Sequence, residues 1–499
     1  MIVGIDVGGT NTDVAYIDED GNLQTFKYPN EYGITRILSD VEERVDLRRS
    51  RLVISTSLPL NILTSQFDRV KVLSLVFPGP GLNYENYGVV LKGYVNHRGD
   101  VVEDIDPAEV EMALKSGEFD AVAISGKFSV RNPELEHRAL EVVRRYVGEE
   151  SVALSHHVGH INFPLRINTT IINAKISREV WELTNSIRRF TEDFFYYKGD
   201  GGIIPWRVAM RNPSELYNSS PASVAYGARY LTGEENAIIV DIGGTTTDIL
   251  LLRNGAPEVE EKVRIQGMKT HVRCVRSVSI PFGGDSLYSG ELKPYRLDKP
   301  LAFGGKYATL TDLLNVVGEE IGDHRRSRDA LNESAAEREV EAYTDRVAEV
   351  VSGVDSDLII GTGYLARYLI PKIAEKSGKR YVIPMHHESA NAVGVAVSRV
   401  SLTLYARFDT ERRVAIFNGE LDSEQIERIS GHPDDEELIS MAVERARELA
   451  VEYGAHERDV RDVDVVYFNS FSIVRGGIKR GKIADVVVQI RPGLCCDAV

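Results

Sequence analysis

The chain has 499 residues, of which 43% are hydrophobic and 27% are charged, a composition typical of a soluble globular protein. This length exceeds one ordinary hydrophobic core and predicts two or three domains. The net charge of −16 argues against a nucleic-acid partner, because binding a phosphodiester backbone needs clustered Lys and Arg. It does not exclude a small phosphate ligand, which a glycine-rich turn with a cation can hold locally.

The cysteine count and the N-terminus bear on the cellular compartment. Cys274, Cys495 and Cys496 form neither a disulfide framework nor a zinc-binding pattern, which suits a reducing cytoplasm. Met1 leads directly into a predicted strand, and no apolar run approaches the roughly 20 residues needed to span a bilayer. We therefore expect a cytoplasmic protein with no signal peptide and no membrane contact.

Residues 4–13 are the first stretch that indicates chemistry. Their pattern predicts a strand, a tight turn at Gly8 and Gly9, and a second strand. Consecutive glycines let backbone amides approach an anion, and threonine hydroxyls add donors. Asp6, at the strand end, can hold Mg²⁺ or its waters against phosphate oxygens. A single copy of this pattern is equally consistent with a plain β-hairpin.

The following part of the chain predicts alternating strands and helices. We expect strands at 70–77, 121–125 and 151–155, and an amphipathic helix that starts at Asn132-Pro133 and continues to Val147. Strands that alternate with helices indicate an α/β sheet. A long helical stretch is then predicted from Pro164 toward Phe195.

Two histidine-rich segments invite a metal hypothesis. His156, His157 and His160 follow a predicted strand, and His386-His387-Glu388 forms a second group. No nearby acid or cysteine completes a recognisable ligand pattern around the first group. We therefore favour ordinary structural roles for both groups over metal binding.

A near copy of the first hairpin returns at residues 240–248, after a predicted small-residue helix at 219–228. Both copies share the frame D-x-G-G-T-x-T-D, with Asp241 in the place of Asp6. The shared acid and threonines favour phosphate binding over two unrelated hairpins.

Further glycine pairs occur at 283–284 and 304–305, and either pair alone is consistent with a plain loop. A charged helix is predicted between Asn332 and Gly353, with a solvated acidic face. A strand at 359–364 then opens through Gly361-x-Gly363 into a helix, an arrangement that can lay backbone against an adenine or ribose.

Beyond about residue 401 the pattern predicts a small α+β appendage, with one helix at 436–453 and strands at 465–474 and 483–490. Residues 476–482 fit G-x-x-x-x-G-K, but Ile483 replaces the required Ser or Thr and no helix follows. We interpret this segment as a basic hairpin tip.

The order of these motifs resembles the actin, sugar kinase and Hsp70 superfamily, in which two ribonuclease-H-like lobes close over ATP and Mg²⁺. The resemblance implies an α/β fold with one lobe at 1–163, a second at 164–400 and the α+β appendage at 401–499. Within this superfamily, the chain resembles the ATP-dependent hydantoinase A and 5-oxoprolinase family most specifically. The resemblance lies in the two hairpins and in linking stretches spread over residues 1 to about 400. These stretches are 168–170, 173–174, 200–202, 220–222, 283–286, 309–312 and 391–394.

The resemblance implies an enzyme that uses ATP to open a cyclic amide or imide, such as 5-oxoproline or a hydantoin. Phosphorylation of the carbonyl oxygen would precede attack by water, because that oxygen is a poor leaving group until it is phosphorylated. Positioning and charge neutralisation would then drive the phosphoryl transfer.

Matching positions assign roles to individual residues. Asp6 and Asp241 would hold the metal, while Asp13 and Asp248 would either complete its shell or pin the hairpins. Asp285 and Asp312 would activate water or contact the metal. The nucleotide would contact Gly8, Gly9, Thr10, Thr12, Gly243, Gly244, Thr245, Thr246, Gly283, Gly284, Gly361 and Gly363.

Two departures from the family pattern affect the site. Asn11 stands where the family commonly has a bulky residue, and Asp285 interrupts a Gly-Gly-Gly-Ser stretch. The family usually works with a large hydantoinase B-type subunit, separate or fused. We therefore expect this chain to be part of a hetero-oligomer.

Three alternatives share the fold. A small-molecule kinase or ATP-dependent ligase would form a stable phosphorylated product or use an amine acceptor. A non-metabolic ATP-driven switch would carry a client-binding domain, for which the last 100 residues look small. A reductase activator is disfavoured, because Cys274, Cys495 and Cys496 lack the spacing of an iron-sulfur site.

Overall fold

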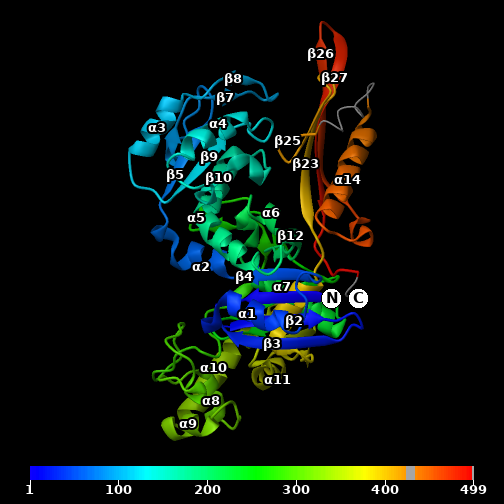
Figure 1. Cartoon of the computed structure of the whole chain (residues 1–499). Coiled ribbons are helices and arrows are strands. Elements are labelled where there is room, and N and C mark those ends of the chain that lie inside the picture. The colour runs from blue at the N-terminus through cyan, green and yellow to red at the C-terminus, as the bar shows by residue number, and fades with distance from the viewer. Residues whose placement is uncertain (10, 423–432, 497–499) are drawn as a thin grey trace.

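The computed structural model describes residues 1–9, 11–422 and 433–496. The protein is a mixed α/β structure with several separate sheets. Two of these sheets are built around the repeated hairpins, and the strands at the start of the chain, drawn in blue, lie near the middle of the molecule in Figure 1. Within the described ranges, no helix combines the length and the apolar character needed to cross a membrane.

The first hairpin lies in a six-stranded sheet with the order β12-β11-β4-β1-β2-β3. Strands β1 and β2 are antiparallel, β1 and β4 are parallel, and β11 runs parallel to β4. Strand β1 is apolar on both sides because both of its faces are covered. Val3 and Ile5 pack toward α1 and α5 (Phe163–Ile187), while Ile2 packs toward α12 (Ala390–Val397). The bounds are β1 (Ile2–Val7), β2 (Asn11–Ile17), β3 (Leu23–Pro29), β4 (Arg51–Thr56), β11 (Phe195–Tyr197), β12 (Ile203–Pro205) and α1 (Gly33–Glu42).

The second hairpin repeats this construction in the sheet β15-β14-β13-β21-β22, with β20 also paired to β14. Strands β13 and β14 are antiparallel, and β13 and β21 are parallel. The two predicted hairpins are therefore confirmed as equivalent structures. The bounds are β13 (Ala237–Ile242), β14 (Thr247–Arg253), β15 (Ala256–Pro257), β20 (Val278–Ile280), β21 (Leu358–Thr362) and β22 (Arg380–Val382).

Two helices join the hairpin sheets, α7 (Ser220–Thr232) and α12 (Ala390–Val397). Helix α12 packs on β1 and β2, α7 packs on β13 and β14, and the two helices contact each other. Small residues make this contact possible: a Cβ atom on Gly227 would collide with the carbonyl oxygen of Ala390, and one on Gly394 with that of Ser223. The predicted small-residue helix thus sets the separation of the two hairpins.

A second α/β layer is inserted between β4 and β11. Its sheet has the order β10-β9-β5-β6, with all strands parallel, and it is covered by helices. The predicted strands and the predicted helix after Asn132 are confirmed here. The bounds are β5 (Val72–Phe77), β6 (Val89–Val90), β9 (Ala121–Gly126), β10 (Val152–Leu154), α2 (Leu58–Ser65), α3 (Pro107–Lys115), α4 (Glu134–Val143) and α5 (Phe163–Ile187), with a side hairpin of β7 (Tyr94–Val95) and β8 (Val101–Glu103).

The helix expected to continue toward Phe195 is wrong at its C-terminal end. Helix α5 stops at Ile187, and Phe195 begins strand β11, which pairs with β4. Phe194 and Tyr196 are buried in the core of the first sheet, so tertiary packing overrides the local helical pattern. The first sheet consequently takes strands from both sides of residue 163, and the domain boundaries at 163 and 400 stay predictions.

A helical group extends from the second hairpin sheet (Figure 1). Val340, Tyr343 and Val347 of α10 are buried against its neighbours, which confirms the predicted amphipathic helix. The bounds are α8 (Leu310–Val316), α9 (His324–Ala330), α10 (Glu333–Ser352) and α11 (Ala366–Ser377). The remaining short elements are α6 (Trp206–Ala209), β16 (Val259–Glu260), β17 (Arg264–Ile265), β18 (Met268–Lys269) and β19 (Cys274–Val275).

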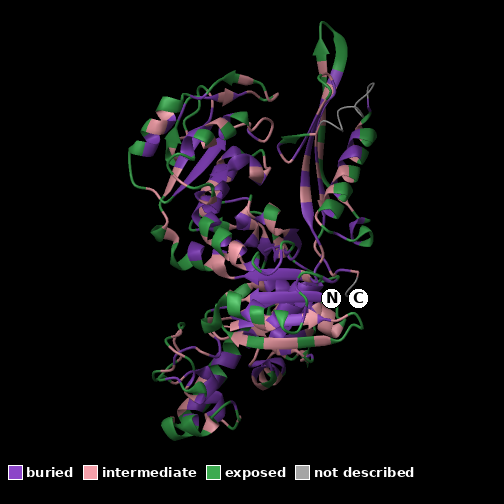
Figure 2. Cartoon of the chain, viewed as in Figure 1, coloured by how far each residue is buried: buried purple, intermediate pink, exposed green. Residues whose placement is uncertain are grey.

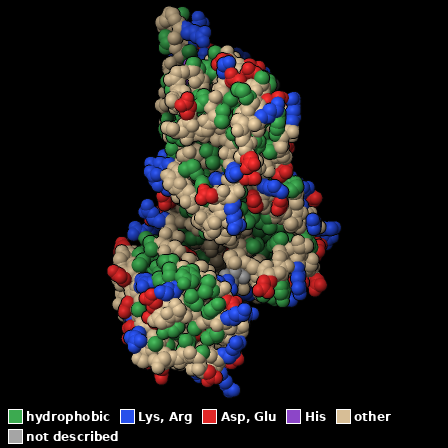
Figure 3. Space-filling model, turned by 90° about the vertical axis from the view of Figure 1, so that its left-hand side faces the viewer, with side chains coloured by type: hydrophobic (Ala, Val, Ile, Leu, Met, Phe, Trp, Pro, Cys, Tyr) green, Lys and Arg blue, Asp and Glu red, His purple; other side chains and the backbone are tan. Residues whose placement is uncertain are grey.

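The predicted α+β appendage is confirmed as the sheet β25-β24-β23-β27-β26 with helix α14 packed on it. Gly476 and Gly477, at φ of 61° and 78°, form the turn of a long hairpin, so the basic-tip interpretation is also confirmed. This tip projects beyond the body and is exposed, with Lys and Arg at its end (Figures 2 and 3). The bounds are β23 (Leu402–Asp409), β24 (Val414–Phe417), β25 (Glu420–Leu421), α14 (Asp435–Glu452), β26 (Asp464–Arg475) and β27 (Ile478–Ile490).

Replacing Gly394 by Val tests the contact between α7 and α12. We expect a loss of about 1–3 kcal/mol in the free energy of unfolding, because the new side chain overlaps the backbone of Ser223. Gly117→Ala is the matched control, since a Cβ there meets no atom within 4 Å. Thermal and urea unfolding measure both variants, and equal stability of the two would contradict the proposed role of the contact.

Candidate functional site: two equivalent hairpins

The two turns are closed by the same backbone hydrogen bond. The amide of Gly8 donates to the carbonyl oxygen of Asn11 at 3.1 Å, and the amide of Gly243 donates to that of Thr246 at 3.0 Å. In each hairpin the two aspartates of the motif lie opposite each other, Asp6 with Asp13 and Asp241 with Asp248. The sequence repeat therefore corresponds to a repeat in three dimensions.

The neighbouring parallel strand supplies a hydroxyl to each strand-end aspartate. Ser55 on β4 and Thr362 on β21 occupy equivalent register positions beside Asp6 and Asp241. Thr362 Oγ1 donates to Asp241 Oδ1 at 2.8 Å, and the Ser55 side chain bonds to Asp6. These donors orient the carboxylates, and sequence reasoning did not identify them because they lie 49 and 121 residues away in the chain.

Additional polar contacts hold the first hairpin. Asn391 Nδ2, at the start of α12, donates to Asp6 Oδ2 at 3.1 Å, and Ser389 Oγ donates to Asp13 Oδ1 at 3.2 Å. Lys27 Nζ lies 3.2 Å from Asp13 Oδ1. Lys27 is opposite Asp13 across β2 and β3, so the register of the third strand was the signal that could have identified it.

The four aspartates of the hairpins all ionise less readily than usual. Burial raises the pKa of Asp241 to about 7 and that of Asp13 to about 6, and it also raises the pKa of Asp6 and Asp248. The Asp6 charge is among the causes of the higher pKa of Asp241. Burial is the largest cause of both raised pKa values, and the effect of the Asp6 charge on Asp241 is minor.

A third glycine segment closes on the second turn. The amides of Gly284 and Asp285 donate to the carbonyl oxygens of Gly243 and Gly244 at 2.9 and 2.7 Å. Asp285 Oδ2 lies 3.3 Å from Arg296 Nε, and burial raises the pKa of Asp285 to about 6. The structure thus brings Gly283, Gly284 and Asp285 beside the second turn, and the nucleotide contact that the resemblance implies for the two glycines stays a prediction.

Asp312 lies in a different environment from the other candidate acids. It is fully buried and forms a capping box at the start of α8. Its carboxylate accepts from the amides of Leu301, Ala302 and Thr309 and from the hydroxyls of Thr309 and Ser327. These hydrogen bonds occupy the carboxylate, so Asp312 stabilises the start of α8 and the loop packed on it. We assign Asp312 no part in the proposed chemistry.

The remaining predicted residues surround the turns. Thr12 Oγ1 donates to Asn30 Oδ1 at 2.9 Å, and Asn30 Nδ2 donates to the Gly8 carbonyl at 2.7 Å, so Asn30 supports the first turn. Thr246 donates to Asp248 at 3.1 Å, while Thr245 is exposed. Thr10 lies outside the described residues.

Gly361 lies on strand β21, which pairs with β13 of the second hairpin, and Gly363 follows directly after this strand. Gly361 is buried on β21 against Ile370. Gly363 has φ of +84°, and a Cβ there would collide with the backbone of Ile242, which explains the need for glycine. Its amide donates to the His387 carbonyl at 2.9 Å, so this backbone is fixed against the segment before α12.

The histidine clusters have protein partners. His156 Nδ1 lies 2.7 Å from Glu136 Oε2 in a buried pair, and His160 stacks on His271 with ring centroids 3.7 Å apart. His387 Nδ1 lies 2.9 Å from the Gly363 carbonyl oxygen. Over residues 1–9, 11–422 and 433–496, the one His, Cys, Asp or Glu group with the spacing of a metal site is Asp459, Cys495 and Cys496, and it includes no histidine.

Comparison with known families gives two matches in succession. Residues 2–147 match the profile described as "Hydantoinase/oxoprolinase N-terminal region", and residues 166–360 match "Hydantoinase/oxoprolinase". The chain belongs to the hydantoinase/oxoprolinase family. Both hairpins lie inside the matched ranges, whereas Gly361, Thr362, Gly363, Ser389 and Asn391 lie beyond them.

Curated relatives of this family member include two named subunits. It is 25% identical to the caprolactamase subunit alpha of Pseudomonas jessenii over 334 residues, covering 57% of this chain and 48% of the relative. It is 23% identical to the acetone carboxylase beta subunit of Xanthobacter autotrophicus over 458 residues, covering 73% and 63% respectively. The chain thus spans less than two thirds of the length of these relatives.

Two solved structures share the fold of this family member. The nucleotide-free acetone carboxylase has a TM-score of 0.67 at 19% identity and covers 100% of this chain and 82% of its own. The ATP-dependent caprolactamase of P. jessenii has a TM-score of 0.63 at 21% identity, with 98% and 87% covered. The fold is therefore shared over the described length, the C-terminal sheet included.

Replacing Asp241 by Asn tests whether the negative charge of Asp241 destabilises the folded, ligand-free protein. The folded pKa of about 7 exceeds the ordinary unfolded value of about 3.9, so the folded state binds the extra proton and loses stability as pH rises through 4 to 7. Asn carries no charge, and we expect the variant to be about 1–3 kcal/mol more stable than the wild type at pH 8, with a smaller gain at pH 5. Thermal unfolding of the ligand-free protein at both pH values measures this difference.

The exposed carboxylate of Asp20 supplies the control, since Asp20→Asn should change stability little at either pH. A lower stability of Asp241→Asn at pH 8 would show that the charge of Asp241 is compensated in the folded protein.

Proposed function

We propose that this protein uses ATP to open a cyclic amide or imide, such as a hydantoin or 5-oxoproline, by phosphorylating its carbonyl oxygen. The observation that carries the proposal is the pair of equivalent hairpins, in each of which a strand-end aspartate, Asp6 or Asp241, lies beside a glycine turn and is bonded by a hydroxyl of the neighbouring parallel strand. Under this proposal the two hairpin sheets are the two ribonuclease-H-like lobes, and one nucleotide lies between their turns.

The turns can receive phosphate oxygens through their backbone. The amides of Gly8 and Gly243 are used to close the turns, whereas Gly9 is exposed and no atom lies within 4 Å of the Cβ position there. An anion can therefore approach this backbone closely. Gly244 has less space, because a Cβ on it would meet Asp285 Oδ2 at 2.9 Å.

The carboxylates fit Mg²⁺ in their chemistry. Asp6, Asp13, Asp241 and Asp248 offer hard oxygen donors, and burial raises the pKa of each of them. When bound, Mg²⁺ would neutralise charge on the phosphates. Asp6 and Asp241 are the residues we expect to hold it or its waters.

Asp285 is the residue that we assign to proton transfer. It lies against the second turn, and its pKa of about 6 suits a group that accepts a proton from water near neutral pH. Arg296, 3.3 Å away, keeps its carboxylate oriented. Water activated there would attack the carbon of the phosphorylated amide, and the ring C–N bond would then break as its nitrogen takes up a proton. A second water would hydrolyse the resulting acyl phosphate, releasing phosphate and the ring-opened acid.

The relatives favour one further candidate. Besides a caprolactamase, they include subunits named for acetone carboxylase and for the acetophenone carboxylase of Aromatoleum aromaticum. Like the proposed cyclic-amide hydrolase, an ATP-dependent carboxylase would activate a carbonyl group at the hairpins. The two enzymes would differ in the molecule that reacts with the activated carbon. All three relatives are named as subunits, which supports our proposal that this chain works with a large hydantoinase B-type partner.

ATP turnover against a substrate panel distinguishes these functions. We expect hydantoins, 5-oxoproline or simple lactams to stimulate ADP and phosphate release, with the ring-opened acid as product. The panel is assayed with and without a candidate large subunit, and with ketones plus bicarbonate as the carboxylase arm. Stimulation by an alcohol or amine alone would establish the kinase or ligase alternative, and turnover that no small molecule changes would favour an ATP-driven switch.

Asp6→Asn and Asp241→Asn should each lower Mg²⁺-dependent ATP turnover by about 100-fold or more, because each removes a charge at the shared cation site. Asp20→Asn should retain wild-type turnover. Nucleotide binding and product formation are measured on the same preparations, and thermal unfolding checks that each variant is folded. Near-normal turnover in both site variants would reject the assigned metal role.

A further inference from the structure

Two cysteines and an aspartate from separate segments meet beside the C-terminal sheet. Asp459 lies in the short 3-10 helix Glu457–Val460 after α14, and Cys495 and Cys496 lie in the segment that follows β27. One carboxylate oxygen and the two sulfur atoms all lie within 4.8 Å of one another. Asp459 is 5% exposed and Cys495 2%, while Cys496 is half-buried. We call these three residues the cysteine cluster.

Backbone hydrogen bonds hold the cysteine cluster in place. The amide of Cys496 donates to Asp459 Oδ1 at 3.0 Å, and the amide of Cys495 donates to the carbonyl oxygen of Val397, the last residue of α12, at 2.7 Å. In Figure 1 the red segment after β27 accordingly returns to the blue strands of the first sheet. Packing between distant segments therefore places the three donor atoms together, and the sequence spacing of the cysteines did not predict it.

One guanidinium group lies against the cysteine cluster. Arg51, at the start of β4, donates through Nη1 to Cys495 Sγ at 2.8 Å and through Nη2 to the carbonyl oxygen of Ser398. Two thiolates and a carboxylate around a divalent cation leave one net negative charge, which the charge of Arg51 offsets. A hydrogen bond of this kind also orients a metal-bound thiolate.

The donor set of the cysteine cluster selects a thiophilic cation. Zn²⁺ binds thiolate sulfur at about 2.3 Å and carboxylate oxygen at about 2.0–2.2 Å, so donors around it in a tetrahedron lie roughly 3.5–3.8 Å apart. Donor atoms that already lie within 4.8 Å of one another need only a small side-chain adjustment to reach these separations. Mg²⁺ prefers oxygen donors alone, so the hairpin carboxylates and the cysteine cluster suit different cations.

We propose that Asp459, Cys495 and Cys496 bind one Zn²⁺ ion, with a water molecule as the fourth ligand. The ion would tie the turn after α14 to the segment after β27, and through Arg51 it would tie both to the first sheet. It would thereby hold the C-terminal sheet against the rest of the chain. This inference goes beyond the proposed ATP-dependent reaction and is independent of it, because the cysteine cluster contains no residue of the hairpins.

Titration of Co²⁺ into the reduced, metal-free full chain tests the donor set. Mg²⁺ is kept in excess to saturate the hairpin carboxylates. We expect one equivalent of Co²⁺ to give the near-ultraviolet charge-transfer absorption of a cobalt–thiolate bond, and Zn²⁺ to displace it, because oxygen and imidazole donors give no such band. A Co²⁺ complex without this band would overturn the proposal.

Substitutions assign the ligands. Cys496→Ser should weaken Zn²⁺ binding at least about 100-fold, because losing a ligand costs more than losing a group that only orients one. Asp459→Asn should weaken Zn²⁺ binding and keep the charge-transfer band, since both thiolates remain. Cys274→Ser is the matched control, because Cys274 lies on β19 outside the cluster, and it should bind Zn²⁺ like the wild type.

Unchanged Zn²⁺ affinity in Cys496→Ser or in Asp459→Asn would overturn the assignment. Thermal unfolding of the metal-free proteins confirms that the variants are folded, and Asp459→Asn decides the question if Cys496→Ser does not fold.

Hydrogen exchange tests the effect of the ion on the fold. Zn²⁺ should slow amide exchange in residues 457–460 and 491–496 of the wild type and leave exchange in Cys496→Ser unchanged. Slower exchange only in other parts of the chain would place the ion elsewhere and overturn the proposal.

Discussion

The close contact between α7 and α12 is the constraint on which the rest of this structure depends. Gly227 and Gly394 bring the two helix backbones together without intervening side chains. Because α12 also packs on β1 and β2 and α7 on β13 and β14, the separation of these helices sets the separation of the hairpins. The close packing of small residues therefore fixes the relative position of the two carboxylates, Asp6 and Asp241.

That position has an electrostatic cost in the ligand-free protein. Asp6 is buried, Asp13, Asp241 and Asp248 are half-buried, and Lys27 is the cation paired with Asp13. Raised pKa values are the expected result, since burial and like charge both disfavour ionisation. A divalent cation with phosphate oxygens would relieve this repulsion, which links the stability of the arrangement to the ligand that we propose for it.

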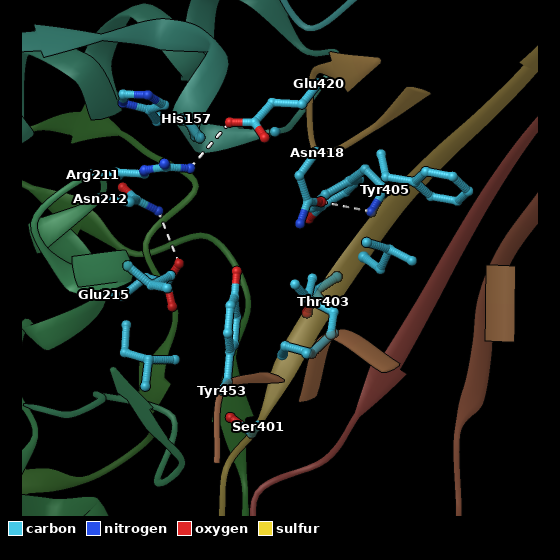
Figure 4. Close-up of a pocket in the computed structure, with 18 of the residues that line it drawn as sticks. His157, Arg211, Asn212, Glu215, Ser401, Thr403, Tyr405, Asn418, Glu420 and Tyr453 are labelled. Carbon is cyan, nitrogen blue, oxygen red and sulfur yellow. Dashed lines mark hydrogen bonds and ion pairs between the residues drawn. The ribbon is translucent and has the colours of Figure 1, made fainter. Parts of the chain in front are cut away.

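A cavity of about 510 Å³ lies beside β23, and several of the charged side chains that line it are paired, Lys198 with Asp200 and Arg211 with Glu420 (Figure 4). It is formed where the C-terminal sheet packs against the part of the chain that contains α5 and the first sheet, so it exists only when these parts are assembled. The C-terminal sheet therefore supplies one wall of this cavity.

The sequence by itself determined the two hairpins, the small-residue helix and the α+β character of the last 100 residues, because short-range periodicity and glycine pairs encode these features locally. It also identified the family through motif order. Only the tertiary structure decided that Phe195 starts a strand, that Asp312 caps a helix, and that Thr362, Lys27 and His271 acquire their particular partners. These outcomes depend on strand register and packing between distant segments, which no local pattern specifies.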